Sequence, residues 1–345
     1  MSGTIALAAG AACALSATAV VPLRRLALRW DLTDRPGGHK AHARPTPYLG
    51  GIAITVGTVV PTVAVLGFAD PQLTAILLAA TAISLLGLID DIAPLPAVTR
   101  LVVEAVVACG VVLSGVHVTV TATWLDGLLT VVWIVVMTNS FNLLDNMDGA
   151  LGSVTTVSAA LLAVTAAVQD RPELAMLLCA LACAGLGFLP HNWAPARIFM
   201  GDSGSLFIGF TLACSAVVLV VGRDPDTVAA GLLLPTFVAT FDTFTVFLTR
   251  ALAGRSPLRG GTDHVSHRLR SMGMGTRLVA TALGAIAALT CALWLVTTLG
   301  GVSPVTAVVA AGVVAVVLVS LLRGARVHSP ARPPHAPQRI RERRR

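Results

Sequence analysis

The sequence predicts an all-α, polytopic integral membrane protein with about eleven transmembrane helices. Hydrophobic residues make up 55% of the 345 residues and charged residues only 12%, with a mean hydropathy of +0.83. These values lie outside the range of soluble globular domains. The apolar residues also form runs of about 20, the length that a helix needs to cross the hydrocarbon core. Finally, the lysines and arginines gather between alternate runs, as they do in membrane proteins of fixed orientation.

The expected spans are separated by short connections that contain proline, glycine or charged residues, which end a membrane helix. They cover residues 3–23, 48–69, 72–90, 98–117, 125–143, 150–168, 173–190, 203–222, 228–252, 278–299 and 303–322. The first run has no basic segment before it and is followed by Arg24, Arg25 and Arg29. This order is typical of a retained anchor with its N-terminus outside the cell, not of a cleaved signal peptide.

With that orientation, every lysine and arginine except Arg171 and Arg223 falls on the cytoplasmic side. An odd number of spans then places the C-terminus in the cytoplasm. We expect residues 1–325 to form a single transmembrane catalytic domain with cytoplasmic active-site loops. Residues 326–345 form a basic tail rich in proline and arginine, which we expect to be disordered and attracted to anionic lipid headgroups.

The net charge of +7 does not indicate nucleic-acid binding, because the basic residues lie in the connections and the tail and form no stripe. The six cysteines fall inside apolar runs, where they are expected to pack as small apolar residues. The polar residues that remain form several clusters, and the topology places these clusters on one cytoplasmic membrane face.

The first cluster is the pair Asp90 and Asp91 at the end of the third run. Adjacent carboxylates repel each other unless they share a cation or a proton, so the pair indicates a divalent metal or a raised pKa. A solvated helix end is the alternative interpretation.

The second cluster follows the fifth run and contains Asn139, Asn142, Asp145 and Asp148. Carboxylates and amides are costly to hold in hydrocarbon, so such a cluster at the end of a span indicates a functional site.

The third cluster surrounds Asp202 at the start of the eighth run. Glycines and serines between Gly201 and Ser205 allow backbone N–H groups to approach an anion, and the following helix N-terminus favours phosphate. An aspartate beside such a nest indicates Mg²⁺ that bridges protein and phosphate. A plain helix N-cap is the alternative.

The remaining cytoplasmic connections supply cations and one further amide. His264, His267 and Arg268 lie in one loop and Lys40 in another, and these side chains fit diphosphate oxygens. Asn192 precedes the Asp202 cluster. Solvated loop residues are the alternative. Together, the clusters provide what transfer of a phosphoryl group from a soluble nucleotide to a lipid acceptor requires.

In combination, these motifs resemble the polyprenyl-phosphate N-acetylhexosamine-1-phosphate transferases, the glycosyltransferase family 4 that includes MraY, WecA and TagO. They occur in the family's order over residues 34–273. The motifs are Pro45-Thr-Pro-Tyr-Leu-Gly-Gly51, Asp90-Asp91, Asn139-x-x-Asn142-x-x-Asp145-x-x-Asp148-Gly149, Phe199-Met-Gly-Asp202-x-Gly-Ser and the histidine loop. The WecA-like branch of this family also has about eleven spans with the orientation given above.

The resemblance implies transfer of N-acetylglucosamine 1-phosphate from UDP-N-acetylglucosamine to undecaprenyl or decaprenyl phosphate, with release of UMP. This would be the first membrane step of cell-envelope polysaccharide synthesis, at the plasma membrane, and Mg²⁺ or Mn²⁺ would be the cofactor. Direct attack by the lipid phosphate is favoured over an aspartyl intermediate. A homodimer is one state that the family shows.

By matched positions, the resemblance also assigns roles to individual residues. The expected catalytic residues are Asp90, Asp91, Asp145, Asp148, His264 and His267; the expected substrate-binding residues are Lys40, Asn139, Asn142, Asn192 and Arg268; and the expected metal ligands are Asp202 and Asn142.

Two departures from the family pattern lie in the histidine loop. Ser266 stands where the family commonly has a histidine, and Gly261-Thr262 replaces the Asp-Arg that often precedes the motif. In addition, Arg268-Leu269 replaces the Phe-Glu that follows the histidines of MraY. A UDP-MurNAc-pentapeptide donor is therefore not expected, whereas another UDP-sugar remains an alternative. A multispan transporter is the rival class, but of the ionisable groups only Glu104 and Asp242 are expected deep in the membrane. We expect Asp242 to support the site or to pair with a neighbouring span.

Overall fold

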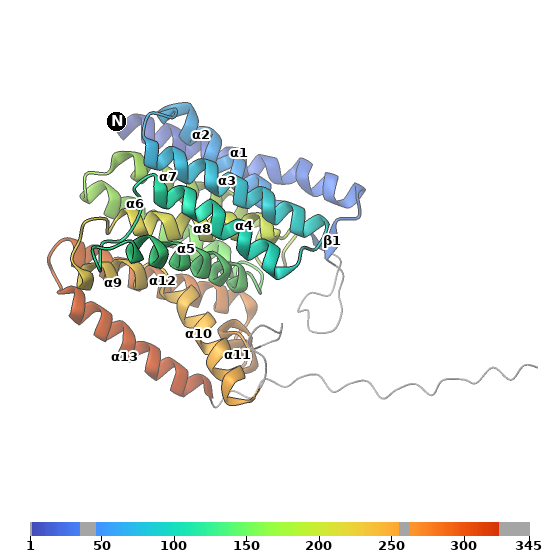
Figure 1. The fold of residues 1–345 in the computed structure, drawn as a ribbon. Coiled ribbons are helices and arrows are strands. Elements are labelled where there is room, and N and C mark those ends of the chain that lie inside the picture. The colour runs from blue at the N-terminus through green and yellow to red at the C-terminus, as the bar shows by residue number, and fades with distance from the viewer. Residues whose placement is uncertain (1, 35–45, 255–262, 324–345) are drawn as a thin grey trace, which may run out of the picture.

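The computed structural model describes residues 2–34, 46–254 and 263–323. Within these residues, thirteen helices form an elongated bundle (Figure 1). They are α1 (Ser2–Arg29), α2 (Gly50–Leu66), α3 (Pro71–Ile92), α4 (Ala97–Leu113), α5 (Leu125–Leu144), α6 (Ala150–Val168), α7 (Pro172–Asn192), α8 (Gly201–Val218), α9 (Pro225–Leu233), α10 (Phe237–Leu252), α11 (Val265–Ser271), α12 (Thr276–Thr298) and α13 (Pro304–Arg323). The prediction of an all-α polytopic membrane protein is confirmed.

Each of the expected spans contains a helix of the bundle, and α11 is a short additional helix. Within the described ranges, eight helices are long and apolar enough to cross a membrane, and the bent pair α9 and α10 makes a ninth if it counts as one span. Helices α2 and α4 have 17 residues each and are shorter than the expected spans. Helix α4 ends before residue 117 because Gly115, with φ of 96°, turns the chain.

The expected span over residues 228–252 is not one straight helix. The chain forms α9 and α10 instead, bent by 80° at a break between Leu233 and Phe237. Pro235 lies in this break. Proline has no N–H group for the helix ladder and its ring crowds the preceding turn, so it explains the interruption.

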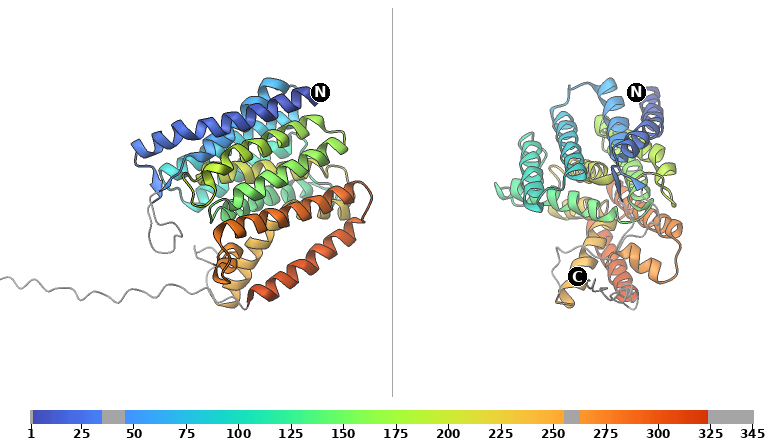
Figure 2. Two further views of the ribbon diagram at one scale, coloured as in Figure 1. Left: turned by 180° about the vertical axis from the view of Figure 1, so that it is seen from behind. Right: turned by 90° about the vertical axis from the view of Figure 1, so that its right-hand side faces the viewer.

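Helix α8 is the centre of the bundle, and every residue from Ser203 to Val218 is buried. It packs mainly against α3 and α5, while α6, α7, α1 and α12 form the other layers (Figure 2). Two glycines bring neighbouring backbones into direct contact with α8. A Cβ built on Gly51 would lie 2.2 Å from Gly204 N, and one on Gly87 would lie 2.4 Å from Asp202 O. The start of α8 is therefore held by α2 and α3 at a distance that no larger residue allows.

Two short strands, β1 (Thr33–Asp34) and β2 (Thr46–Pro47), pair in an antiparallel manner beside the start of α8. Strand β2 and the segment after it also pair with the chain that leads into α8: Phe199 N–H donates to Pro47 O at 2.8 Å and Gly51 N–H to Met200 O at 2.8 Å. The first loop of the chain is thus joined to the segment that leads into α8.

Candidate active site

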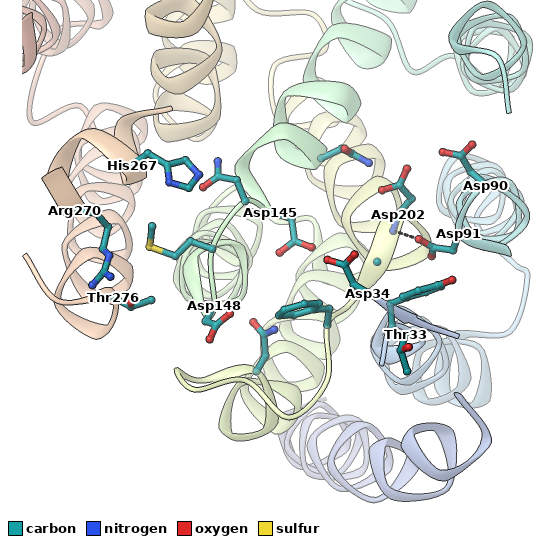
Figure 3. A pocket seen from close by; sticks show the side chains of 17 residues that line it. Thr33, Asp34, Asp90, Asp91, Asp145, Asp148, Asp202, His267, Arg270 and Thr276 are labelled. Carbon is teal, nitrogen blue, oxygen red and sulfur yellow. Dashed lines mark hydrogen bonds between the residues drawn. The ribbon is translucent and has the colours of Figure 1, made fainter. Parts of the chain in front are cut away.

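A cavity of about 640 Å³ opens at the end of the bundle where α3 and α5 end and α8 begins (Figure 3). Among the residues that the structure describes, its walls carry six aspartates and two groups that can be cationic, His267 and Arg270. The lining residues are Thr33, Asp34, Tyr48, Asp90, Asp91, Asn142, Asp145, Asn146, Met147, Asp148, Asn192, Phe199, Gly201, Asp202, His267, Arg270 and Thr276. This cavity is therefore acidic, and it favours a cation or a ligand that arrives with one.

The structure brings together most of the residues expected from the sequence. The expected site residues that line the cavity are Asp90, Asp91, Asn142, Asp145, Asp148, Asn192, Asp202 and His267. Asn139, His264 and Arg268 do not line it. Lys40 lies outside the described residues.

Asp91 lies against the first turn of α8. Its Oδ1 accepts from Asp202 N–H at 2.9 Å and its Oδ2 from Ser203 N–H at 3.1 Å. The backbone nest expected to bind a phosphate here thus holds the Asp91 carboxylate instead. The sequence interpretation failed on this point because the end of α3 meets the start of α8 only in the folded bundle. Gly201, with φ of 69°, makes this approach possible, since a Cβ there would lie 2.5 Å from Asp91 Oδ2.

The neighbouring Asp90 has a different environment. Arg100, in the first turn of α4, donates through Nη1 to Asp90 Oδ2 and to Asp202 Oδ2, the latter at 2.9 Å. Leu95 N–H also donates to Asp90 Oδ1 at 2.6 Å. The Arg100 guanidinium therefore joins the end of α3 to the start of α8 through two carboxylates.

The end of α5 supplies the middle of the cavity. Asp145 follows the last residue of this helix. Its burial, together with the negative charges of Asp202, Asp91 and Asp148, raises the pKa of Asp145 to about 8. Nearby, Asn142 Nδ2 is buried and has no hydrogen-bond partner among the described groups. Both side chains can therefore respond to a ligand that brings positive charge or polar atoms.

Asp148 and Asn192 hold the wall between α5 and α8 in shape. Asp148 Oδ2 accepts from Ala196 N–H at 2.9 Å. Asn192 is 2% exposed; its Oδ1 accepts from Gly149 N–H at 3.0 Å, and its Nδ2 donates to Ile198 O at 3.1 Å. Both ends of the Asn192 amide are thus used within the protein, which indicates that it shapes the site.

The histidine segment, which contains His264 and His267, is attached to α10, the second helix of the bent pair. Asp242 Oδ2 lies 2.7 Å from His264 Nδ1, and Asp242 Oδ1 accepts from Val265 N–H at 2.7 Å. His264 is buried behind the cavity wall, whereas His267 reaches the cavity from α11. Burial and the charge of His264 lower the pKa of His267, which favours its neutral imidazole. Asp242 therefore pairs with the histidine segment and not with a neighbouring span, and this contact agrees with the alternative expectation that it supports the site.

Two expected substrate-binding side chains make contacts inside the protein. Arg268 donates through Nη1 to Leu322 O at 3.2 Å and through Nη2 to Thr249 Oγ1 at 2.8 Å, so it joins α11 to α13 and α10. Asn139 donates to Glu104 Oε2 within the α4–α5 pair. The structure gives each a role in holding helices together.

The donor set fits a hard divalent cation whose coordination shell is completed by water or by a ligand. Within the part of the chain that the structure describes, no three side chains of His, Cys, Asp or Glu form a ready metal cluster. The cavity does offer several carboxylate oxygens and the unpartnered amide of Asn142. Mg²⁺ typically takes one or two carboxylates and completes its shell with water and phosphate oxygens, so these residues fit it.

Sequence reasoning missed several residues of the site, chiefly Arg100, Asp34 and Arg270. Arg100 had a usable signal, since it lies ten residues after Asp90 at the start of a membrane helix that contains few charges. Asp34 lies in the short strand β1 and Arg270 in the short helix α11. Their positions in the cavity depend on how these segments fold back on the bundle.

Comparisons with known proteins show the family to which the chain is similar. The family model for glycosyl transferase family 4 matches residues 73–220. A protein of Streptomyces coelicolor named as a glycosyltransferase is 38% identical over 325 residues, which cover 92% of this chain and 76% of that protein. The decaprenyl-phosphate N-acetylglucosaminephosphotransferase of Mycolicibacterium smegmatis is 31% identical, over 74% of this chain and 72% of that enzyme. The undecaprenyl-phosphate alpha-N-acetylglucosaminyl 1-phosphate transferase of Thermotoga maritima is 28% identical, over 70% and 74%.

Proposed function

Because the chain belongs to glycosyl transferase family 4, we propose that it transfers N-acetylglucosamine 1-phosphate from UDP-N-acetylglucosamine to a polyprenyl phosphate. An oxygen of the lipid phosphate forms a bond to the sugar-linked phosphorus of the donor. The bond from that phosphorus to the bridging oxygen breaks, and UMP leaves with this oxygen. The products are UMP and a polyprenyl-diphosphate sugar.

The acidic cavity at one end of an apolar helix bundle is the observation that carries the proposal. A lipid-borne acceptor reaches such a site from the membrane and a nucleotide from the solvent. Both reactants are anionic, so the six aspartates of the cavity require cations between protein and substrates. Bound Mg²⁺, or Mn²⁺ in its place, would neutralise the donor phosphates, with Asp202 and Asn142 as its protein ligands.

The remaining residues position the reactants. Asp90 lies beside the membrane-facing α4 and would orient the lipid phosphate, whereas Asp91 would keep Asp202 in place through the backbone of α8. Asp145 and Asp148 would face the nucleotide, and His267 would face the diphosphate. The basic connections in the sequence support a cytoplasmic position for this end of the bundle, and we propose the plasma membrane as the protein's location.

A broken span is also typical of transporters. The buried carboxylate of Asp242 on α10, however, pairs with His264 behind the cavity wall, and its contacts support the histidine segment. A transferase activity explains both this contact between Asp242 and the histidine segment and the family membership.

The test is a transfer assay with purified protein in detergent, undecaprenyl or decaprenyl phosphate, Mg²⁺ and radiolabelled UDP-N-acetylglucosamine. We expect labelled lipid that requires Mg²⁺ and is lost in the Asp202→Asn variant. If only another UDP-sugar gives product, the donor assignment is wrong and the chemistry stands. If folded protein gives no lipid product with any UDP-sugar, the transferase proposal is wrong.

A further inference from the structure

Arg100 occupies the space between two carboxylates that the proposed reaction needs. Its guanidinium contacts Asp90 and Asp202, and its side chain is 25% exposed. Because Arg100 lies in the first turn of α4, the helix dipole disfavours its charge, and the carboxylates must offset that cost. The contact therefore depends on the negative charge of the cavity.

A third carboxylate lies behind Arg100. Glu104 is one helical turn further along α4, is 0% exposed, and interacts with the charge of Arg100. Its Oε2 accepts from Asn139, but its Oε1 is buried and has no partner among the described groups. The Arg100 Nε group is also buried and lacks one there. Such atoms are costly to leave unsatisfied. Glu104 Oε1 and Arg100 Nε could therefore form a hydrogen bond with each other that this structure does not contain.

We propose that Arg100 is an internal cation that bridges Asp90 and Asp202 until a divalent cation replaces it, and that Glu104 receives the released guanidinium. The inference deepens the proposed function, on which it rests for the identity of the cation. Its basis is the juxtaposition of one arginine, two cavity carboxylates and one buried carboxylate with a free acceptor.

The physical reason is charge balance. Before a cation arrives, Arg100 reduces the repulsion between the carboxylates of Asp90 and Asp202. A divalent cation at Asp202 repels the guanidinium and satisfies the same oxygens more strongly. The movement of Arg100 toward Glu104 then removes two unsatisfied buried groups at once. Cation affinity in this site is therefore set by a competition within the protein.

The experiment measures Mn²⁺ binding by electron paramagnetic resonance, with the full chain in detergent and neither nucleotide nor lipid present. We expect Arg100→Gln to bind Mn²⁺ about tenfold more tightly than wild type, because the competing charge is gone. Glu104→Gln is expected to bind it several-fold more weakly, because the released arginine loses its acceptor. A variant that fails to fold would only weaken Mn²⁺ binding, so misfolding cannot produce the tighter binding expected of Arg100→Gln.

Arg270→Gln is the matched control, because Arg270 lines the cavity and carries the same charge as Arg100, on the side opposite Asp202 (Figure 3). We expect it to change Mn²⁺ affinity less than about twofold. Equal tightening in Arg100→Gln and Arg270→Gln would show a general charge effect and overturn the proposal, as would unchanged affinity in both Arg100→Gln and Glu104→Gln. The readout needs no turnover, so it separates this inference from a failure of the transferase assignment.

Discussion

The two sides of the cavity are built in different ways. On one side, the α3–α8 wall carries Asp90, Asp91 and Asp202; on the other, the histidine wall carries Asp242 with His264 and His267. The α3–α8 wall is fixed by backbone contacts, because Asp91 accepts two N–H groups of α8. The histidine wall is held by side-chain contacts, those of Asp242 with His264 and Val265 N–H and those of Arg268 with α10 and α13.

This difference follows from the packing of the helices. The start of α8 is at the centre of the bundle, and glycines allow α2 and α3 to approach it closely. The histidine segment begins beside α10, which is displaced from the main bundle by the bend after α9 (Figure 1). With fewer neighbours to pack against, it needs a buried polar tether. Substitutions should therefore act through backbone geometry on the first side and through side-chain chemistry on the second.

The largest effect is expected from Gly201→Ala in the α3–α8 wall. The new Cβ would lie 2.5 Å from Asp91 Oδ2 and would also occupy a backbone conformation with φ of 69°. The displaced carboxylate would shift the start of α8 and with it Asp202, so we expect transfer activity to fall about 100-fold.

Gly222→Ala is the matched control for this variant. Gly222 has φ of 72° but nothing within 4 Å of its ideal Cβ, so it carries the same backbone strain without the collision. Thermal unfolding and transfer activity of both variants should be measured together. Equal loss of activity in the two would show that strain alone matters and that the Asp91 contact does not.

A smaller effect is expected from Asp242→Asn in the histidine wall. The amide can still accept from Val265 N–H, but it no longer provides a charged partner for His264 Nδ1. We expect kcat to fall about tenfold, because loss of a partner that orients a site residue typically has this magnitude. Since the charge on Asp242 favours protonation of the nearby His267, the pH profile should also move.

The profile of Asp242→Asn is the informative measurement. Loss of a negative charge beside His267 lowers the pKa of that imidazole further. The part of the pH–activity profile that reports the titration of His267 should therefore move to lower pH. An unchanged profile with reduced kcat would restrict Asp242 to a structural role.

The smallest effect concerns Asp145, which lies between the two walls. Its pKa of about 8 in the folded protein is above the ordinary value near 4, so the folded state binds the proton more tightly than the unfolded state. The stability associated with this proton is fully present at low pH and is lost as pH rises to about 8. Asp145→Asn removes this dependence of stability on pH.

We expect Asp145→Asn to melt on the order of 2 °C higher than wild type at pH 9 in EDTA, with a smaller difference at pH 5. Thermal unfolding at both pH values measures this. A difference that is independent of pH would mean that the carboxylate of Asp145 does not titrate as described.

Much of this architecture was predictable because hydrophobic runs and basic connections reflect the membrane directly. Residues 72–90 and 203–222 needed no tertiary information to be recognised as helices, and Asp90, Asp145 and Asp202 were recognised because carboxylates at span ends are costly and rare. The sequence also predicted that the ends of these spans share one face, since an alternating topology requires it. The order of the motifs indicated the family, and the comparisons with known proteins confirmed it.

Only the tertiary structure distinguished residues that the sequence presents as alike. Asp90 and Asp91 are neighbours in the chain, yet Asp90 contacts an arginine of α4 and Asp91 contacts the backbone of α8. The contacts of Arg100 and Asp242 also could not be predicted from the sequence. Hydrophobic patterning fixes where a helix lies in a membrane because burial from water is a local property, whereas partners are decided by helix rotation and close approach, which depend on all neighbouring helices at once.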